Sequence, residues 1–212
     1  MTSQEDQIAL DLAEHAFVDP SFETTRELAL ACRACHLWEH ATQTVFGEGP
    51  APAPVLLIGE QPGDKEDLTG RPFVGPAGLK LDAALDEAGI DRQKIYVTNA
   101  VKHFKYVPGG KIRLHQKPVA VEIKACRPWL ERELDLVQPK AMAAMGATAA
   151  HSLFGRPMPV NKNRGRFFDL GKSKALITVH PSYLLRIQDE KEAEAEYARF
   201  VEDLTLLLPF LT

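Results

Sequence analysis

The chain has 212 residues, of which 45% are hydrophobic and 25% are charged, and this length suits one compact domain with a sizeable core. It has no apolar run of the about 18 residues that a membrane span needs, and its polar, acidic beginning does not resemble a secretory signal. We therefore expect a cytoplasmic monomer without a membrane partner, whose single domain spans residues 1–212.

Hydrophobic periodicity and turn residues divide the chain into alternating helices and strands. Helices are predicted over residues 3–18, 22–34, 76–89, 118–136, 147–154 and 189–208. Strands are predicted at the short apolar runs 55–58, 95–98, 140–145 and 175–179. This alternation predicts an α/β fold, a three-layer α/β/α sandwich with a short, mostly parallel central sheet, to which residues 1–30 add an N-terminal helical extension.

Polar groups follow the predicted strands at 59–64, Asn99, Gly146 and 180–182. Ligands of open α/β sheets bind beyond the carboxyl ends of the strands, so we expect the functional site there. The first of these loops, GEQPGDKEDLTGRPFVGPAG, has neither the Gly-Lys-Ser/Thr of a P-loop nor a GxGxxG motif, which argues against a nucleotide. An ordinary strand-to-helix turn would explain it, but its length favours a functional loop.

Asn99 and His180 each have a purely structural interpretation, the first as a helix cap or turn former and the second as a buried, hydrogen-bonded histidine. Together they supply what pyrimidine chemistry needs. An amide side chain can read both a donor and an acceptor on a base edge. A histidine can hydrogen-bond an oxygen on which negative charge develops.

The net charge of −4 argues against a nucleic-acid-binding protein, but the charge is unevenly distributed. No acidic residue lies between Asp91 and Glu122, and seven basic residues fall there: Arg92, Lys94, Lys102, Lys105, Lys111, Arg113 and Lys117. A second basic stretch holds Lys162, Arg164 and Arg166. The segment 109–117, with two glycines before its basic residues, is predicted to be a flexible loop that lies against phosphates.

Three cysteines cannot all pair within one chain, so a disulfide framework is excluded. Cys32 and Cys35 have the Cys-x-x-Cys spacing, which alone also fits a redox pair, and Cys126 supplies a third thiolate. A metal or cluster site needs four ligands. We choose His103 as the fourth, although His36 and His40 are nearer in sequence. Three cysteines and one histidine fit zinc or an iron-sulfur cluster.

The motifs GEQPGDKED, GRPFVGPAG, TNAVKHFK, ACRPWL and HPSYLLR, with Gly-Gly-Lys-x-Arg-x-His at 109–115, are specific and span most of the chain from Cys32 onward. Through them the chain resembles the uracil-DNA glycosylase superfamily, specifically its bacterial iron-sulfur branch and the UdgX type. The resemblance implies a 4Fe-4S cluster held by Cys32, Cys35, His103 and Cys126, with histidine where the branch usually has cysteine. It also implies uracil-containing DNA, with single strands preferred, as the partner.

The resemblance further implies that His115 attacks the sugar and links the protein covalently to C1′, with Glu60 setting its tautomer. The family's loop string is KRRIH and this chain has KIRLH, so Ile112 replaces a basic residue. Phe73, Asn99, Gln61 and His180 are expected to bind uracil, with Gln61 and Asp64 also supporting catalysis. Contacts to DNA are expected from Lys111, Arg113, Arg164, Ser182, Leu184, Leu185 and Arg186, with Leu184 or Leu185 as a wedge.

Three alternatives remain open at this stage. The protein would be a conventional glycosylase with multiple turnover if the His115 loop only gripped DNA. It would be a DNA-binding module without catalysis if it released no uracil. It would be a zinc protein of unrelated function if it lacked the absorbance of iron-thiolate bonds.

Overall fold

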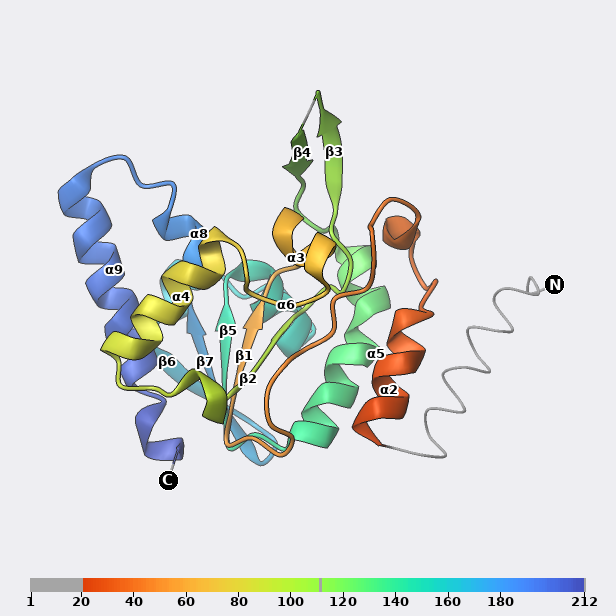
Figure 1. Ribbon diagram of the computed structural model, residues 1–212. Helices are drawn as coiled ribbons and strands as arrows, with labels where there is room; N and C mark the ends of the chain where they lie inside the picture. The colour runs from red at the N-terminus through yellow and green to blue at the C-terminus, as the bar shows by residue number, and fades with distance from the viewer. Residues whose placement is uncertain (1–20, 111, 212) are drawn as a thin grey trace.

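The computed structural model describes residues 21–110 and 112–211, so the helix predicted at 3–18 lies outside the described residues (Figure 1). Among these residues, five strands form one sheet in the order β2-β1-β5-β7-β6. Their bounds are Val55–Gly59 for β1, Tyr96–Asn99 for β2, Ala141–Met145 for β5, Arg166–Leu170 for β6 and Ser173–Thr178 for β7. All neighbours are parallel except β6, which runs antiparallel to β7.

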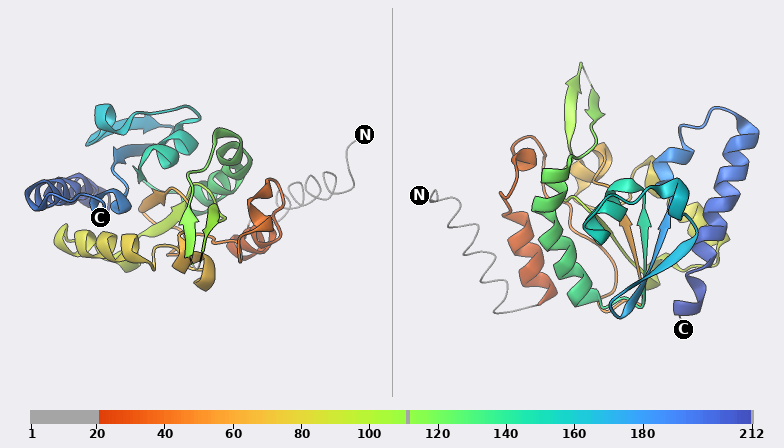
Figure 2. Two further views of the ribbon diagram at one scale, coloured as in Figure 1. Left: turned by 90° about the horizontal axis from the view of Figure 1, so that it is seen from above. Right: turned by 180° about the vertical axis from the view of Figure 1, so that it is seen from behind.

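Helices cover both faces of the sheet, because its central strands are apolar on both sides (Figure 2). In β1, Val55 and Leu57 join the core beneath α4 (Pro76–Glu87) and α9 (Glu190–Thr205). Leu56 and Ile58 point the other way, into the core beneath α5 (Ala120–Val137) and α6 (Ala147–Phe154). This confirms the predicted three-layer α/β fold with a mostly parallel sheet.

The predicted helix at 22–34 is shorter in the structure, where α2 covers Phe22–Leu30 and turns follow through the two cysteines. Further short helices, which the apolar pattern did not predict, cap or connect the main elements. They are η1 (His36–Glu39), α3 (Asp64–Thr69), η2 (Arg92–Lys94), α7 (Val160–Asn163), α8 (Pro181–Leu184) and η3 (Leu208–Phe210). No helix among the described residues is long and apolar enough to cross a membrane.

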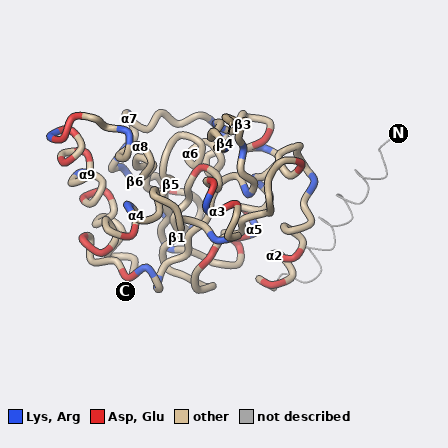
Figure 3. The backbone as a smooth tube through the Cα atoms, turned by 45° about the horizontal axis from the view of Figure 1, so that its top comes forward, with Lys and Arg blue, Asp and Glu red and all other residues tan. Residues whose placement is uncertain are grey.

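The segment predicted to be a flexible basic loop forms an antiparallel hairpin of β3 (Tyr106–Gly109) and β4 (Ile112–His115). Figure 1 shows it standing out from the body at the carboxyl end of the parallel strands, beside α3. Figure 3 shows Lys and Arg close to this hairpin and to α8, and acidic residues on α3 beside the hairpin and along α9, α4 and α2. The hairpin therefore rises over the edge of the sheet where a site was expected.

Candidate active site

A cavity of about 410 Å³ opens at the carboxyl ends of the parallel strands, a size typical of small-ligand pockets. Its walls come from segments far apart in the sequence: Glu60 and Gln61 after β1, His115 at the end of β4, Gly146 after β5 and His180 after β7. The sheet therefore brings together the residues that the sequence placed after its strands.

Phe73 and Asn99 converge beside this cavity, and both are almost fully buried. The ring of Phe73 lies 6.1 Å from that of His180, at an angle of 30°. A Cβ atom on Gly59 would lie 2.3 Å from Asn99 Oδ1 and 2.6 Å from Phe73 Cζ, so only glycine lets the amide and the ring approach here. The arrangement offers an aromatic face and an amide to a planar ligand.

His180 is held as a neutral imidazole with one defined donor. The backbone N–H of Ser182 donates to His180 Nδ1 at 3.2 Å, so this nitrogen accepts and Nε2 carries the proton. The Ser182 hydroxyl lies 2.8 Å from the same nitrogen. Burial, followed by the nearby His115 and Arg186, lowers the pKa of His180 to about 4. The Nε2–H can therefore donate to a ligand oxygen at neutral pH.

His115 faces the carboxylate of Glu60 across the cavity, with 3.6 Å between Nε2 and Oε1. The Thr148 hydroxyl donates to the other oxygen of Glu60 and fixes that carboxylate. Burial is the main cause that lowers the pKa of His115. The charge of Glu60 raises this pKa, and the charge of Arg186 lowers it further. The imidazole is therefore mainly neutral near pH 7 and keeps a lone pair, as a nucleophile requires.

The side chain of Gln61 joins the two ends of the hairpin. Its Nε2 donates to the carbonyls of Lys105 and Gln116, both at 3.1 Å, and its Oε1 accepts from the Lys105 N–H at 3.2 Å. These residues flank the hairpin directly before β3 and after β4. Gln61, which was predicted to bind uracil, also lines the cavity, and its side-chain amide positions the hairpin that carries His115.

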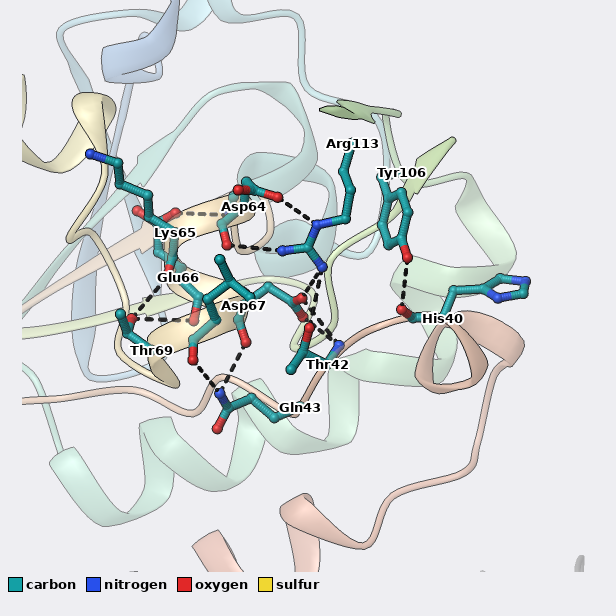
Figure 4. Close-up of polar contacts among 12 residues, drawn as sticks. His40, Thr42, Gln43, Asp64, Lys65, Glu66, Asp67, Thr69, Tyr106 and Arg113 are labelled. Atoms are coloured by element: carbon teal, nitrogen blue, oxygen red, sulfur yellow. Dashed lines mark hydrogen bonds and ion pairs between the residues drawn. The ribbon is translucent and has the colours of Figure 1, made fainter. Parts of the chain in front are cut away.

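Arg113 anchors the middle of the hairpin onto α3 (Figure 4). Its guanidinium donates to Asp64 Oδ1 at 2.5 Å, to Asp67 Oδ2 at 2.6 Å and to the Thr42 hydroxyl at 3.2 Å. The ring centre of Tyr106 lies 5.1 Å from the guanidinium carbon. Arg113, predicted to contact phosphate, and Asp64, predicted to support catalysis, thus form an ion pair that holds β4. The buried Asp67 was missed, although its i,i+3 spacing from Asp64 on a helix was a signal.

Some of the other residues predicted to contact DNA are accessible to a ligand, and others are buried. Arg186 lines the cavity and Leu185 is exposed, whereas Leu184 packs in the core, so the wedge would be Leu185. Arg164 is buried and paired with Asp203 at 2.7 Å and with Glu196, so we no longer assign it to DNA. Lys111 lies outside the described residues.

A family model described as the uracil DNA glycosylase superfamily matches residues 46–205, which include the whole sheet and cavity. The chain belongs to this superfamily. It is 39% identical over 167 residues to the type-4 uracil-DNA glycosylase of Thermotoga maritima, covering 77% of this chain and 83% of the relative. It is 30% identical over 189 residues to the type-4 uracil-DNA glycosylase of Archaeoglobus fulgidus, covering 85% and 91%.

In this member of the superfamily, Cys32, Cys35, His103 and Cys126 all line one small cavity, together with Trp129. Trp129 Nε1–H donates to Cys32 Sγ at 3.1 Å, and the Lys102 backbone N–H donates to Cys126 Sγ at 3.2 Å. Such bonds stabilise the thiolates that hold iron-sulfur clusters.

Burial keeps Cys35, His103 and Cys126 uncharged when no ligand is bound. Burial raises the pKa of Cys126 to about 12 and also raises the pKa of Cys35, so both thiols keep their protons at neutral pH unless a bound metal displaces them. Burial lowers the pKa of His103 to about 4, which keeps its ring neutral. Within residues 21–110 and 112–211, no three Cys, His, Asp or Glu side chains are arranged to hold a single metal ion. In a cluster each ligand binds a different iron, so its ligands lie farther apart.

Proposed function

We propose that this protein excises uracil from DNA and then becomes covalently linked through His115 to C1′ of the abasic sugar. The activity of the type-4 relatives supports the excision. The observation that carries the linkage is that His115 enters the same cavity as His180, beside Glu60. The resemblance implies that ordinary members use water as the nucleophile, and in this proposal His115 takes that role.

Excision requires that the base leaves the stack and that its departing anion is stabilised. Phe73 would stack on the extruded uracil, and the buried amide of Asn99 would read its N3–H and O4. The Nε2–H of His180 would donate to O2, where negative charge accumulates as the glycosidic bond breaks. Phe73 and Asn99 are already buried, and Ser182 orients His180, so little reorganisation is needed.

Trapping follows when a lone pair of His115 bonds to C1′ as the electrons of the glycosidic bond leave with uracil. The ring then carries a positive charge, and Glu60 is the nearest carboxylate that can take its proton. Gln61 and Arg113 do not touch the sugar in this scheme. They hold the hairpin so that the imidazole reaches the carbon.

The test is a denaturing gel with a uracil-containing single-stranded oligonucleotide. The wild-type protein should give one equivalent of uracil and a complex that survives denaturation. His115→Ala should lose the complex and release uracil over many turnovers, because His180 and Asn99 still stabilise the leaving group. A denaturant-resistant complex with His115→Ala would identify another nucleophile. Absence of both complex and uracil would show that His115 is required for cleavage itself.

We also propose that Cys32, Cys35, His103 and Cys126 hold a 4Fe-4S cluster. The cluster would tie the loop after α2, the segment after β2 and helix α5 to one another, and it would take no part in bond cleavage. Cys32→Ala should remove the iron and the absorbance near ~400 nm and lower the melting temperature, because ligation and folding are coupled. A full iron content and an unchanged spectrum in His103→Ala would refute the fourth ligand.

A further inference from the structure

Lys105 closes the base of the β3–β4 hairpin, because it directly precedes β3 and bonds to the residue that follows β4. Its carbonyl oxygen accepts from the backbone N–H of Gln116 at 2.9 Å and from Gln61 Nε2 at 3.1 Å. Gln116 comes directly after His115, the last residue of β4. The position of the Lys105 backbone therefore helps to fix where the imidazole of His115 enters the cavity.

The side chain of Lys105 leads away from the hairpin to the carboxylate of Glu122, which is only 1% exposed. Lys105 Nζ lies 2.8 Å from Oε1 and donates to Oε2 at 2.9 Å. Oε2 also accepts from the Val119 N–H at 2.7 Å, which fixes the carboxylate at the first turn of α5. His36 Nε2 lies 3.3 Å from Oε1. The base of the hairpin is therefore tied to α5, a helix of the main body (Figure 1).

Phe104, the residue before Lys105, forms a wall beside His115. Its ring is almost fully buried, stacks on the ring of Tyr106 with 5.1 Å between their centres, and lies 6.1 Å from the ring of His115. Because Phe104 and Lys105 are consecutive, a shift of the lysine would move this wall as well as the end of β4. The bond from Lys105 to Glu122 therefore acts on His115 by two routes.

Resting on the proposed function, we propose that Lys105 and Glu122 are positioning residues that decide whether C1′ bonds to His115 or to water. When uracil has left with the electrons of the glycosidic bond, C1′ accepts a lone pair from one of these two nucleophiles. Attack by His115 forms the covalent complex. Attack by water, followed by loss of a proton to the solvent, gives the abasic sugar and leaves the protein free. The choice depends on placement, because a displacement of about 1 Å slows a reaction by about 10²-fold.

The pair lies outside the cavity that would receive the base. Neither Lys105 nor Glu122 lines that cavity, whereas His115 and His180 do. Loss of the pair should therefore leave the rate of uracil release unchanged and alter the fate of the sugar. The effect on trapping should be smaller than that of a full displacement of the hairpin, because the anchor of Arg113 on α3 remains.

A single turnover on an end-labelled, single-stranded deoxyuridine oligonucleotide tests this inference, with the protein in excess. Covalent complex is measured on a denaturing gel, and free abasic DNA is measured as strand breaks after alkali. The wild-type protein should convert nearly every excised site to complex. Lys105→Met removes the ammonium group and should raise the ratio of free abasic DNA to complex by about 10-fold, part of the loss expected for a displacement of about 1 Å. The rate of uracil release should not change.

Three further variants separate placement of His115 from stability and from charge. Lys105→Arg keeps the ion pair and should keep the wild-type ratio. Lys105→Met/Glu122→Gln leaves no unpaired buried charge and keeps an oxygen that accepts from the Val119 N–H, so it tests the ratio if Lys105→Met alone does not fold. Lys124→Met removes an exposed lysine from the same helix and should behave as wild type.

An unchanged ratio of free abasic DNA to complex in a folded variant without the ion pair would overturn the inference. So would a rate of uracil release that falls in step with complex formation, because the pair would then only support the fold. Both results leave the proposed function intact, since the wild-type protein still forms the complex. A wild-type protein that forms no complex at all would reject the proposed function, and this inference with it.

Discussion

At the scale of single residues, the cavity depends on two histidines that stay neutral for the same reason. Burial is the main cause that lowers the pKa of both His180 and His115, and each lies near Arg186. In the unfolded chain His180 would titrate near 6.5, and in the folded protein it titrates at about 4. The unfolded state therefore binds more protons between these values, and the free energy of unfolding should decrease as the pH falls from 6.5 toward 4.

The same shift predicts the acid limit of uracil excision. A proton on His180 Nδ1 would break the hydrogen bond from the Ser182 N–H that orients the ring, so the Nε2–H donor becomes misplaced only as the pH approaches the pKa of about 4. In His115→Ala, where water completes the reaction, single-turnover excision should stay nearly constant from pH 7.5 to about 5.5. Adding Ser182→Ala removes one hydrogen bond to Nδ1 and should move the acid limb upward by about 0.5–1 unit. If the excision rate of the protein with Ser182 present already fell near pH 6.5, His180 would not be held neutral as described.

At the scale of elements, the hairpin is positioned by Gln61 at its base and by Arg113 on β4. Replacing Arg113 with Gln removes the bonds to Asp64 and Asp67, so His115 should be misplaced while the base pocket is intact. Trapping should slow by about 10²-fold, the scale of a displacement of about 1 Å, and uracil release should persist. Rapid-quench assays that measure both the covalent complex and the released uracil separate the effect on trapping from the effect on excision.

The matched control for Arg113→Gln is Arg71→Gln, which breaks an exposed pair with Glu48 outside the cavity. It should change neither product, since exposed pairs contribute about 0–1 kcal/mol. The salt dependence of DNA binding tests the earlier interpretation of Arg113 as a phosphate ligand. If Arg113→Gln reduced the slope of log K against log salt concentration by about one, Arg113 would be a phosphate ligand. An unchanged slope would support its role as the anchor of the hairpin on α3.

The sequence predicted those elements well whose apolar residues are the ones that the fold buries. Buried parallel strands such as β1 are continuous apolar runs, so the sheet and its carboxyl-end residues could be placed in advance. β6 was missed because it is an edge strand whose residues are mostly exposed. The hairpin was missed because its apolar residues face water, and the glycines and basic residues of 109–117 are typical of a loop. The ion pairs of Arg113 and Arg164 were missed because their carboxylate partners lie more than thirty residues away in sequence.

At the scale of the whole molecule, a buried ion pair joins the base pocket to the cysteine site. Lys102 and Glu133 are almost fully inaccessible and bonded to each other. Lys102 Nζ also donates to the Asn99 carbonyl at 2.8 Å, while its backbone N–H donates to Cys126 Sγ. Glu133 accepts from the Tyr96 hydroxyl at 3.0 Å. The end of β2, helix α5 and the proposed cluster ligands therefore share one polar network.

The final prediction follows from the cost of leaving one member of this network unpaired. Glu133→Gln keeps the shape of the side chain but leaves the buried Lys102 without a counter-charge, which should destabilise the protein by about 3–5 kcal/mol. For a domain of this size that corresponds to a fall of about 10 °C in Tm. Glu131→Gln, on the same helix, breaks an exposed pair with Arg127 and should change Tm by about 1 °C or less. Calorimetry on both variants, with iron content measured alongside, checks the size of the effect. Equal melting temperatures would show that the pair contributes little, and a reduced rate of uracil excision in Glu133→Gln at a temperature where it is fully folded would show that the network also places Asn99.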